Sequence, residues 1–423
     1  MRSLEVVVIG GGPSGLSASW SAASRGVEVA VLEEHEEIGR PRHCAGLVSG
    51  EGLGLIGMPR KSEYVENEIR RAVVVANGFY VELRKLGEPM YVLNREAFDK
   101  AMADRAANRG VEILLRKRAR RVEKSGDGYV VKTDDGSYAC KVVIDGEGAA
   151  SKLARDMGLE GPKLKIPALQ VEAKGHVDLE EVLVVLGEEW APGFFSWVIP
   201  LGDGWLRVGL ASIIGHCDAL LKRLIKRHPL VSKLLRGAEV RNRYGGMIVI
   251  GPPRETRKGN FMVVGDAAGQ TKPLTGGGVV YGALCGSLAG VVASGVISGK
   301  ADASLYERLW RRFLGLEERL GKLLRGVLIG DGVEELLGLA SRSGLLSLIE
   351  ESVHYEYQVT SMVKRPHLSL LGSSLLALLL PAKAFKYLLQ APLPARRRSR
   401  FVRGSAAPVL LVQEAHSTWD QEH

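Results

Sequence analysis

Residues 4–15 of the 423-residue chain read Leu-Glu-Val-Val-Val-Ile-Gly-Gly-Gly-Pro-Ser-Gly. The apolar, β-branched run Leu4–Ile9 is typical of a strand that is buried in a parallel sheet. The glycine-rich turn Gly10–Gly15 fits the pattern Gly-x-Gly-x-x-Gly, and a helical stretch follows it. A second apolar run, Val27–Leu32, ends at the acidic residue Glu33. The order strand, glycine turn, helix, strand and acid predicts a βαβ unit that binds a dinucleotide.

Each glycine of this turn has an expected physical role. Gly10 permits the tight turn, Gly12 lets the backbone approach a pyrophosphate, and Gly15 lets the helix pack close to the strand. The helix start presents free N–H groups and a partial positive charge to the phosphates. Glu33 is expected to hold both ribose hydroxyls of the adenosine.

A second segment, far along the chain, indicates which dinucleotide is the cofactor. Asn260–Asp266 predicts another buried strand, and Gly276–Gly278 opens a helix of small residues. A strand that ends in Gly-Asp can place the Asp266 carboxylate on ribityl hydroxyls. A glycine-led helix start can direct its dipole at the flavin pyrimidine ring and stabilise the reduced anion. Nicotinamide enzymes have no need of this second element, so the sequence predicts FAD.

Three motifs in order carry a first resemblance. They are the glycine turn, the Asp-Gly segment Asp145–Arg155, and the Gly-Asp-Ala-Ala-Gly segment Gly265–Gly269. Together they resemble the motifs of the p-hydroxybenzoate hydroxylase superfamily of flavoproteins. The resemblance implies an enzyme in which two separate segments of the chain bind the two ends of FAD.

Two further segments carry a closer resemblance. Gly39–Ser49 contains Pro-x-x-Cys-x-Gly-Leu, and Phe194–Pro200 reads Phe-Phe-Ser-Trp-Val-Ile-Pro. Over about residues 1–390 the chain resembles the geranylgeranyl reductase family, whose nearest members are archaeal digeranylgeranylglycerophospholipid reductases. The family's usual Tyr, Phe and Gly are replaced here, and these departures concern the lipid tunnel more than the flavin site. The replacing residues are Phe195, Ile199 and Ala45.

The resemblance implies contacts to the cofactor, position by position. Ser14 should touch the pyrophosphate, Glu33 the adenosine ribose and Ala119 the adenine. The residues expected along the ribityl chain and the flavin ring are Cys44, Ala45, Leu47, Asp266, Gly278 and Val279. Arg95 should face the phosphates or the ribityl chain. It also has a rationale of its own, because Asn94 is a plausible helix N-cap that puts Arg95 at a helix start.

The family reduces isolated carbon–carbon double bonds in polyprenyl chains, so the resemblance implies a geranylgeranyl reductase that acts on archaeal ether-lipid precursors. Such alkenes have no carbonyl to accept electron density, so hydride transfer from flavin must be coupled to protonation of the other carbon. This chemistry requires a dry, apolar tunnel. The expected wall residues are Phe194, Phe195, Trp197 and Pro200. Cys44 is a candidate proton donor or gate, and His43 is a weaker candidate acid.

Several alternatives remain open at this stage. One is an FAD-dependent aromatic monooxygenase of the same superfamily. Another is a geranylgeranyl reductase with a different prenyl substrate, such as a quinone or tetrapyrrole side chain. A prenyl-binding carrier without activity is a third, although its glycine motifs would be degraded. The external electron donor is also open among NAD(P)H, a deazaflavin and ferredoxin.

The motif order predicts an α/β (α+β) fold with an inserted domain. Runs of strand-like residues with turn signals lie between the Asp-Gly and Gly-Asp motifs, and a helical pattern follows Ala303. The predicted parts are a Rossmann-like FAD-binding domain (1–64, 90–160 and 256–300), an antiparallel-sheet substrate domain (65–89 and 161–255), a C-terminal helical region (301–400) and a flexible tail (401–423).

The charge and hydropathy of the chain bear on whether the protein associates with a membrane. The chain has 57 basic and 48 acidic residues, a net charge of +9, with arginines clustered over 396–403. The leucine-rich stretch 367–381 is too short to span a bilayer, so it is either a core helix or an interfacial anchor. We expect a cytoplasmic protein that is peripheral on the inner face of the membrane, with a polyprenyl lipid substrate and no nucleic-acid partner.

The cysteines and histidines give no metal signal. Four cysteines lie far apart without a Cys-x-x-Cys pair, and nine histidines show no ligand spacing. We expect no metal, and an isolated disulfide stays open.

Overall fold

The structure is a computed structural model, which describes residues 1–76, 79–83, 89–175, 179–253, 255–328 and 355–356. Strand β1 (Arg2–Ile9), helix α1 (Pro13–Ala23) and strand β2 (Val29–Leu32) form the predicted βαβ unit. β1 lies between two parallel neighbours, β2 and β11 (Ser137–Asp145). The side chains of β1 from Val6 onward are buried, which explains why this run is β-branched and apolar.

The sheet around β1 brings the carboxyl ends of distant strands together. Its order is β17-β18-β11-β1-β2-β8, and β10 and β9 continue from β11 as an antiparallel meander. Ile9 pairs with Asp145, and Asp145 pairs with Val263, so the glycine turn, the Asp-Gly motif and the Gly-Asp motif leave the sheet at one edge. The remaining strands are β8 (Glu112–Leu114), β9 (Ala119–Ser125), β10 (Gly128–Thr133), β17 (Arg257–Lys258) and β18 (Phe261–Val263).

Helix α7 (Val279–Ile297) packs directly on α1, and both belong to the largest apolar cluster of the described residues. The approach depends on glycine: a Cβ at Gly286 would lie 2.0 Å from the carbonyl oxygen of Ser14, and one at Gly290 would lie 2.2 Å from that of Ala18. α7 is long and apolar enough to cross a membrane by composition, but 72% of its most apolar window is buried inside the protein. Its apolarity is therefore explained by its place in the core.

A second sheet forms the predicted inserted part. Its order is β16-β12-β15-β14-β13-β5-β6, and every pair is antiparallel except β5 with β13, which is parallel. The exception arises because β5 and β6 come from an earlier part of the chain, and no hairpin joins β5 to β13. The strands are β5 (Arg71–Ala76), β6 (Phe79–Leu83), β12 (Leu164–Lys174), β13 (Glu181–Leu186), β14 (Ser196–Gly202), β15 (Trp205–Ala211) and β16 (Val240–Ile250).

A small sheet, β3-β7-β4, lies between these two. It consists of β3 (Leu47–Ser49), β4 (Val65–Ile69) and β7 (Met90–Leu93). Residues 65–69 were expected in the inserted domain, but β4 pairs with β7 and not with a strand of the second sheet. β4 also contacts β14, so the small sheet connects the two larger ones.

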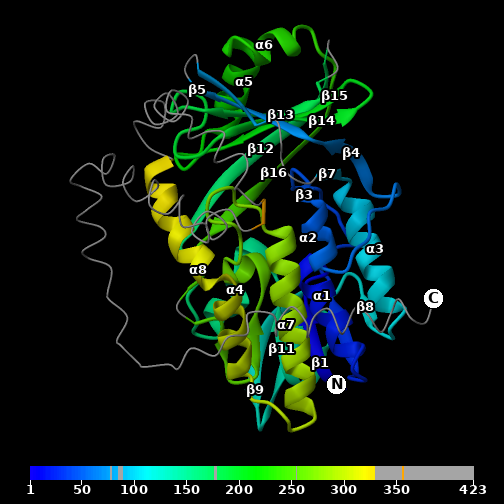
Figure 1. The fold of residues 1–423 in the computed structure, drawn as a ribbon. Helices are drawn as coiled ribbons and strands as arrows, with labels where there is room; N and C mark the ends of the chain where they lie inside the picture. Colours follow the sequence, from blue (N-terminus) through cyan, green and yellow to red (C-terminus); the bar gives the residue numbers. More distant parts are fainter. Residues whose placement is uncertain (77–78, 84–88, 176–178, 254, 329–354, 357–423) are drawn as a thin grey trace.

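Helices cover the outer faces of the sheets (Figure 1). α5 and α6 cover one face of the second sheet, and α3 packs on α1. The predicted C-terminal helical region begins with α8, while the leucine-rich stretch, the arginine cluster and the tail lie outside the described residues. The helices not yet given are α2 (Gly50–Leu55), α3 (Arg95–Ala107), η1 (Gly148–Ala150), α4 (Lys152–Asp156), α5 (Cys217–Arg227), α6 (Val231–Leu234), η2 (Gly265–Ala268) and α8 (Ser304–Leu328).

Candidate active site

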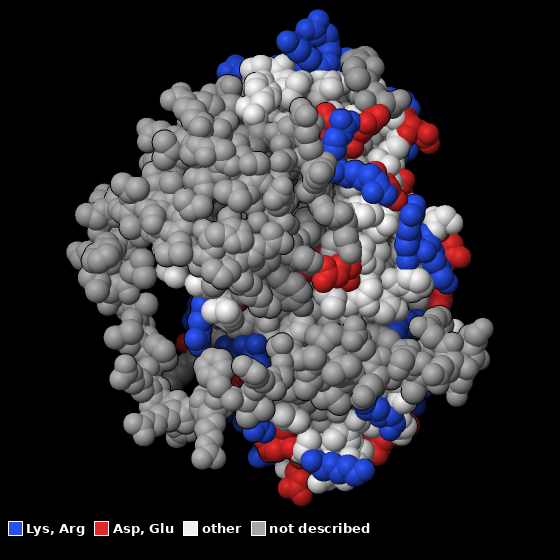
Figure 2. All heavy atoms as spheres, viewed as in Figure 1, with Lys and Arg blue, Asp and Glu red and all other residues white. Residues whose placement is uncertain are grey.

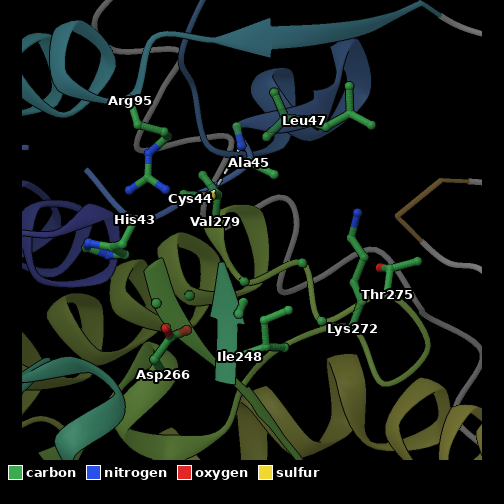
Figure 3. A pocket seen from close by; sticks show the side chains of 18 of the residues that line it. His43, Cys44, Ala45, Leu47, Arg95, Ile248, Asp266, Lys272, Thr275 and Val279 are labelled. Atoms are coloured by element: carbon green, nitrogen blue, oxygen red, sulfur yellow. Dashed lines mark hydrogen bonds between the residues drawn. The ribbon is translucent and has the colours of Figure 1, made fainter. Parts of the chain in front are cut away.

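A cavity of about 490 Å³ lies where the carboxyl edge of the first sheet meets the second sheet. It brings together most of the residues that the sequence singled out, from segments hundreds of residues apart (Figure 3). The predicted residues that line it are Gly12, Ser14, His43, Cys44, Ala45, Leu47, Arg95, Phe194, Phe195, Trp197, Asp266, Gly278 and Val279.

The glycine turn forms one end of this cavity. Gly12 is the N-cap of α1, and a Cβ added there would meet no protein atom within 4 Å. Gly10 has a φ of +93°, and a Cβ at Gly15 would lie 2.0 Å from the Gly10 carbonyl oxygen, so these two glycines shape the turn without lining the cavity. The open space beside free helix N–H groups fits a pyrophosphate.

Asp266 and the helix start of α7 face each other across a short distance. A Cβ at Gly278 would lie 2.8 Å from Asp266 Oδ1, so only glycine leaves this carboxylate its place. Burial raises the pKa of Asp266, although His43 and Arg95 oppose this shift. Among the described residues no donor is hydrogen-bonded to the Asp266 side chain. A buried carboxylate that faces a cavity without a partner fits the hydroxyls of a ribityl chain.

Arg95 lies at the start of α3, as the sequence predicts. Asn94 caps this helix by accepting a hydrogen bond from Ala97 N at 3.2 Å. The guanidinium makes two hydrogen bonds of 2.9 Å to the Asp99 carboxylate and lines the cavity. Burial by itself lowers the pKa of Arg95, but Asp99 and the neighbouring Cys44 outweigh it and raise the pKa above its ordinary value. Arg95 is therefore a fixed positive charge, suited to phosphate or ribityl oxygens.

The segment around Cys44 is held from both sides. Gly46 N donates to Cys44 Sγ at 3.4 Å, and the Ala45 carbonyl accepts from Arg207 Nη1 at 2.7 Å. In Figure 3 the His43, Cys44 and Arg95 side chains lie on one side of the cavity and Asp266 on the other. All four cysteines are free thiols in this structure.

Arg207 is a site residue that sequence reasoning missed. It is 2% exposed on β15, and Nη2 donates to Glu66 at 3.1 Å and to Glu172 at 3.0 Å. The Glu172 carboxylate also accepts from Tyr244, which lines the cavity, and from Asn242. One signal was available, because an arginine within the apolar run Trp205–Ala211 has to find buried partners.

These donors act on the pKa of Glu172. Burial favours the neutral carboxyl, but the hydrogen bonds from Asn242, Arg207 and Tyr244 outweigh it and lower the pKa from 4.5 to about 2. The charged network joins the Cys44 segment, the small sheet and the second sheet, and it does so next to the cavity wall.

The cavity has an apolar extension along the second sheet. The rings of Phe194 and Phe195 stack at 4.3 Å, and Phe195 meets Trp197 edge-on at 6.2 Å. Gln170 Oε1 accepts a hydrogen bond of 3.2 Å from Trp197 Nε1, so the indole is fixed against the cavity. Further apolar lining residues are Ala72, Met90, Val182, Val184, Ile199 and Ile248.

Pro200 was expected in this wall and is not part of it. It follows Ile199 on β14, and the lining residues are Phe195, Trp197 and Ile199. Successive side chains on a strand point to opposite faces, so a residue one position further faces away. Its carbonyl instead accepts a hydrogen bond from Asn67.

Glu33 and Ala119 lie away from the cavity lining, beside the glycine turn. Glu33 is 8% exposed and accepts hydrogen bonds from Gly11 N at 2.6 Å and from His35 N at 2.9 Å. Lys117 N donates to the Glu33 carbonyl, which places the start of β9 and therefore Ala119 close to Glu33. Their adenosine contacts stay predictions.

Lys272, Tyr355 and Glu356 also belong to the site and were not predicted. Lys272 and Tyr355 line the cavity, and Glu356 forms an ion pair with Lys272. Nothing local in the sequence marks Tyr355 and Glu356, because they reach the site from beyond α8. In the described part of the chain, no group of three or more His, Cys, Asp or Glu side chains is arranged to hold a metal ion.

The chain is similar to known flavin-dependent oxidoreductases. A family model described as FAD dependent oxidoreductase matches residues 5–158. The digeranylgeranylglycerophospholipid reductase 2 of Methanopyrus kandleri is 35% identical over 387 residues, which covers 84% of this chain and 96% of the relative. The protein of the same name from Methanothermobacter thermautotrophicus is 36% identical over 354 residues, covering 78% of this chain and 89% of the relative.

Solved structures show the same fold. A geranylgeranyl bacteriochlorophyll reductase-like protein from Thermoplasma acidophilum has a TM-score of 0.73 at 26% identity, covering 90% of this chain and all of that one. The p-nitrophenol 4-monooxygenase PnpA from Pseudomonas putida has a TM-score of 0.66 at 18% identity, covering 85% of this chain and 96% of that one. The second likeness concerns the fold alone.

The open space at Gly12 generates a prediction about cofactor binding. Gly12 has a φ of −84°, which any residue adopts, so Gly12→Val should fold and place its side chain where the pyrophosphate belongs. We expect purified Gly12→Val to lose bound FAD while its melting temperature stays within a few degrees of that of flavin-free wild type. Gly54→Val, at an exposed helix position with open space, should keep its flavin. Full flavin content in Gly12→Val would contradict this placement.

The Glu172 network generates a prediction about pH. The pKa of this carboxyl is lower in the folded state than in the unfolded chain, so its stabilising effect is present above pH 4.5 and is lost as the pH falls toward about 2. Glu172→Gln should unfold more easily at pH 7, by about 3 kcal/mol, because Arg207 loses a buried partner. Its stability should also depend less on pH in that window. Urea unfolding across the window measures both effects.

An exposed ion pair supplies the control. Glu189→Gln, which breaks a surface pair with Arg223, should change the stability by less than about 1 kcal/mol and keep the wild-type pH dependence. Identical pH dependence in wild type and Glu172→Gln would show that Glu172 does not carry this effect.

Proposed function

This chain belongs to the digeranylgeranylglycerophospholipid reductase family, and we propose that it saturates the isolated double bonds of geranylgeranyl chains in archaeal ether-lipid precursors. It is a flavin-dependent oxidoreductase, and its cofactor is FAD. The reaction adds two hydrogens to each double bond of a lipid substrate, and an external electron donor must supply the electrons.

One observation carries the proposal: the glycine cradle and the aromatic wall belong to a single cavity. Gly12 and Ser14 stand at its phosphate end, and Phe195 and Trp197 stand along its apolar extension. A hydrocarbon chain that lies on this wall is adjacent to the cofactor without crossing water. An aromatic or sugar substrate has no need of so much aliphatic lining.

FAD, once bound and reduced by the external donor, would supply the hydride for one carbon of the alkene. The residues of this chain bind, orient and exclude water. Asp266 and Arg95 present one buried carboxylate and one fixed guanidinium to the polar parts of the cofactor. Trp197, held by Gln170, gives the alkene a rigid apolar surface, and rigid placement against the reacting centre is what an unactivated alkene requires. The predicted role of Cys44 as a proton donor or gate stays a prediction.

An enzyme that takes such a lipid from a bilayer must reach the surface of the cell membrane. We propose that the protein is peripheral on the cytoplasmic face of the membrane and docks through α5 and the loop before it. Ile213 and Ile214 in this loop are 53% and 59% exposed. Figure 2 shows Lys and Arg side chains at the end of the molecule where Figure 1 places α5 and α6, and the exposed basic residues of these helices include Lys222, Lys226, Arg227 and Lys233. Apolar side chains beside basic ones suit an anionic lipid surface.

Flotation with liposomes tests this surface. We expect wild type to float with phosphatidylglycerol vesicles and not with phosphatidylcholine vesicles. The double variant Ile213→Asp/Ile214→Asp should lower the bound fraction at least about tenfold, because two apolar anchors are lost. Leu115→Asp, which changes a partly exposed leucine after β8, is the control and should float like wild type. Equal flotation of the double variant and wild type would exclude this loop as the docking surface.

Reduction of the lipid tests the function directly. We expect the protein, reduced with dithionite under anaerobic conditions, to convert digeranylgeranylglyceryl phosphate to products heavier by two hydrogens per reduced double bond. Trp197→Ala should keep its FAD but raise the KM for the lipid, since the alkene loses its rigid surface. Mass spectrometry of the lipid and the flavin spectrum give the two readouts.

Two results would contradict the function. One is an unchanged lipid mass together with oxygen-dependent hydroxylation of an aromatic compound, which indicates a monooxygenase. The other is lipid binding by a colourless protein with no flavin, which indicates a carrier.

A further inference from the structure

Lys272 is a buried ammonium group at the boundary between the two ends of the cavity. Its side chain is 4% exposed and lines the cavity, and it lies in the loop between Asp266 and α7. Two backbone hydrogen bonds fix this loop: Lys272 N donates to the Gly277 carbonyl at 3.0 Å, and Gly276 N donates to the Lys272 carbonyl at 2.8 Å. The side chain extends away from Asp266 in Figure 3.

Glu356 balances this charge, because it pairs with the ammonium group directly. The Glu356 carboxylate is 1% exposed and lies 2.8 Å from Lys272 Nζ. Ser49 Oγ donates to the other carboxylate oxygen at 2.5 Å, and Tyr281 donates to the Glu356 backbone carbonyl at 2.6 Å. The ion pair is therefore anchored to β3 and α7 at once.

Tyr355 completes the surroundings of the ammonium. Its ring centroid lies 3.7 Å from Lys272 Nζ, and its hydroxyl donates to the Leu47 carbonyl at 3.3 Å. The same tyrosine packs on the apolar cluster that contains Phe194, Trp197 and Ile199. Lys272 Nζ is therefore next to a tyrosine that packs on the apolar extension, where a hydrocarbon chain would lie.

Three other groups of the lining, Arg95, Tyr244 and Tyr355, suit proton donation less well. Arg95 donates to the Asp99 carboxylate through Nε and Nη2 and its pKa is raised, so it keeps its proton. Burial raises the pKa of Tyr244 and of Tyr355, which makes both phenols weaker acids. Burial has the opposite effect on Lys272: it lowers the pKa of the ammonium, although Glu356 and Glu317 oppose the shift.

We propose that Lys272 is the proton donor of alkene reduction and that Glu356 holds its ammonium group in the donating position. The proposal rests on the proposed function. One alkene carbon accepts a hydride from the reduced flavin, and the other accepts a proton from Lys272 Nζ. The π bond breaks, two C–H bonds form, the flavin becomes oxidised and Lys272 becomes a neutral amine. Solvent returns the proton to Lys272, and the external donor reduces the flavin again.

Lys272→Arg separates proton donation from charge. Arginine keeps the ion pair with Glu356, but its pKa is too high for it to act as an acid. We expect this variant to bind FAD, to bind digeranylgeranylglyceryl phosphate with wild-type affinity as the oxidised holoenzyme (measured by tryptophan fluorescence), and to melt like wild type. Anaerobic reoxidation of its reduced flavin by the lipid should be at least about 100-fold slower. Lys300→Met, at an exposed position after α7, is the control and should react like wild type.

Wild-type kinetics give a test that needs no variant. The single-turnover rate constant should fall as the pH rises through the pKa of Lys272, because the ammonium form is required, and it should be smaller in D₂O than in H₂O. Glu356→Gln should move this fall to lower pH, since a neutral partner stabilises the ammonium less.

The outcomes distinguish the two proposals. If wild type fails to reduce the lipid at all, the proposed function fails. If wild type reduces the lipid and Lys272→Arg does so at the same rate, or if the wild-type rate is independent of pH, Lys272 is not the donor. Loss of the reaction in Cys44→Ala together with a normal rate in Lys272→Arg would assign the proton to Cys44.

Discussion

The close approach of glycine backbones at the start of α1 is the constraint on which the site depends. The turns after β1, β11 and β18 meet there, because the register of these parallel strands brings Ile9, Asp145 and Val263 to one edge. A Cβ at Gly10 would lie 2.3 Å from the carbonyl oxygen of Gly146, and a Cβ at Gly265 would lie 2.6 Å from Ser14 Oγ. Only glycine permits this convergence, which leaves helix N–H groups and open space for phosphates.

The second sheet contributes a wall to this site, and buried charge ties the two together. Arg207 reaches from β15 to the Ala45 carbonyl and also to Glu66 and Glu172. A guanidinium that is 2% exposed cannot leave its partners without exposing them to an apolar interior, so the Cys44 segment and the sheet hold one relative position. The flavin side and the lipid side of the cavity are therefore kept in register by electrostatics as well as by packing.

The third contribution comes from Tyr355 and Glu356, which reach the cavity from beyond α8. They contact Lys272, Ser49 and Leu47, and Tyr355 lines the cavity. A buried ion pair is costly in an apolar region, and its position beside the hydrocarbon path is consistent with a chemical role for the ammonium.

By itself, the sequence determined the βαβ unit, the FAD cofactor and the family, because these depend on short segments: glycines at fixed spacing, β-branched runs and an acid at a strand end. It also placed Arg95 at a helix start, since Asn94 is a local cap signal. Tertiary structure alone decided which face of β14 meets the cavity, and therefore that Ile199 lines it and Pro200 does not. Tertiary structure also decided that β4 pairs with β7. It also decided the partners of Arg207 and Lys272. Those partners lie 35 to 162 residues away from Arg207 and 84 residues away from Lys272, and a contact across such a separation leaves no periodic or local pattern in the chain.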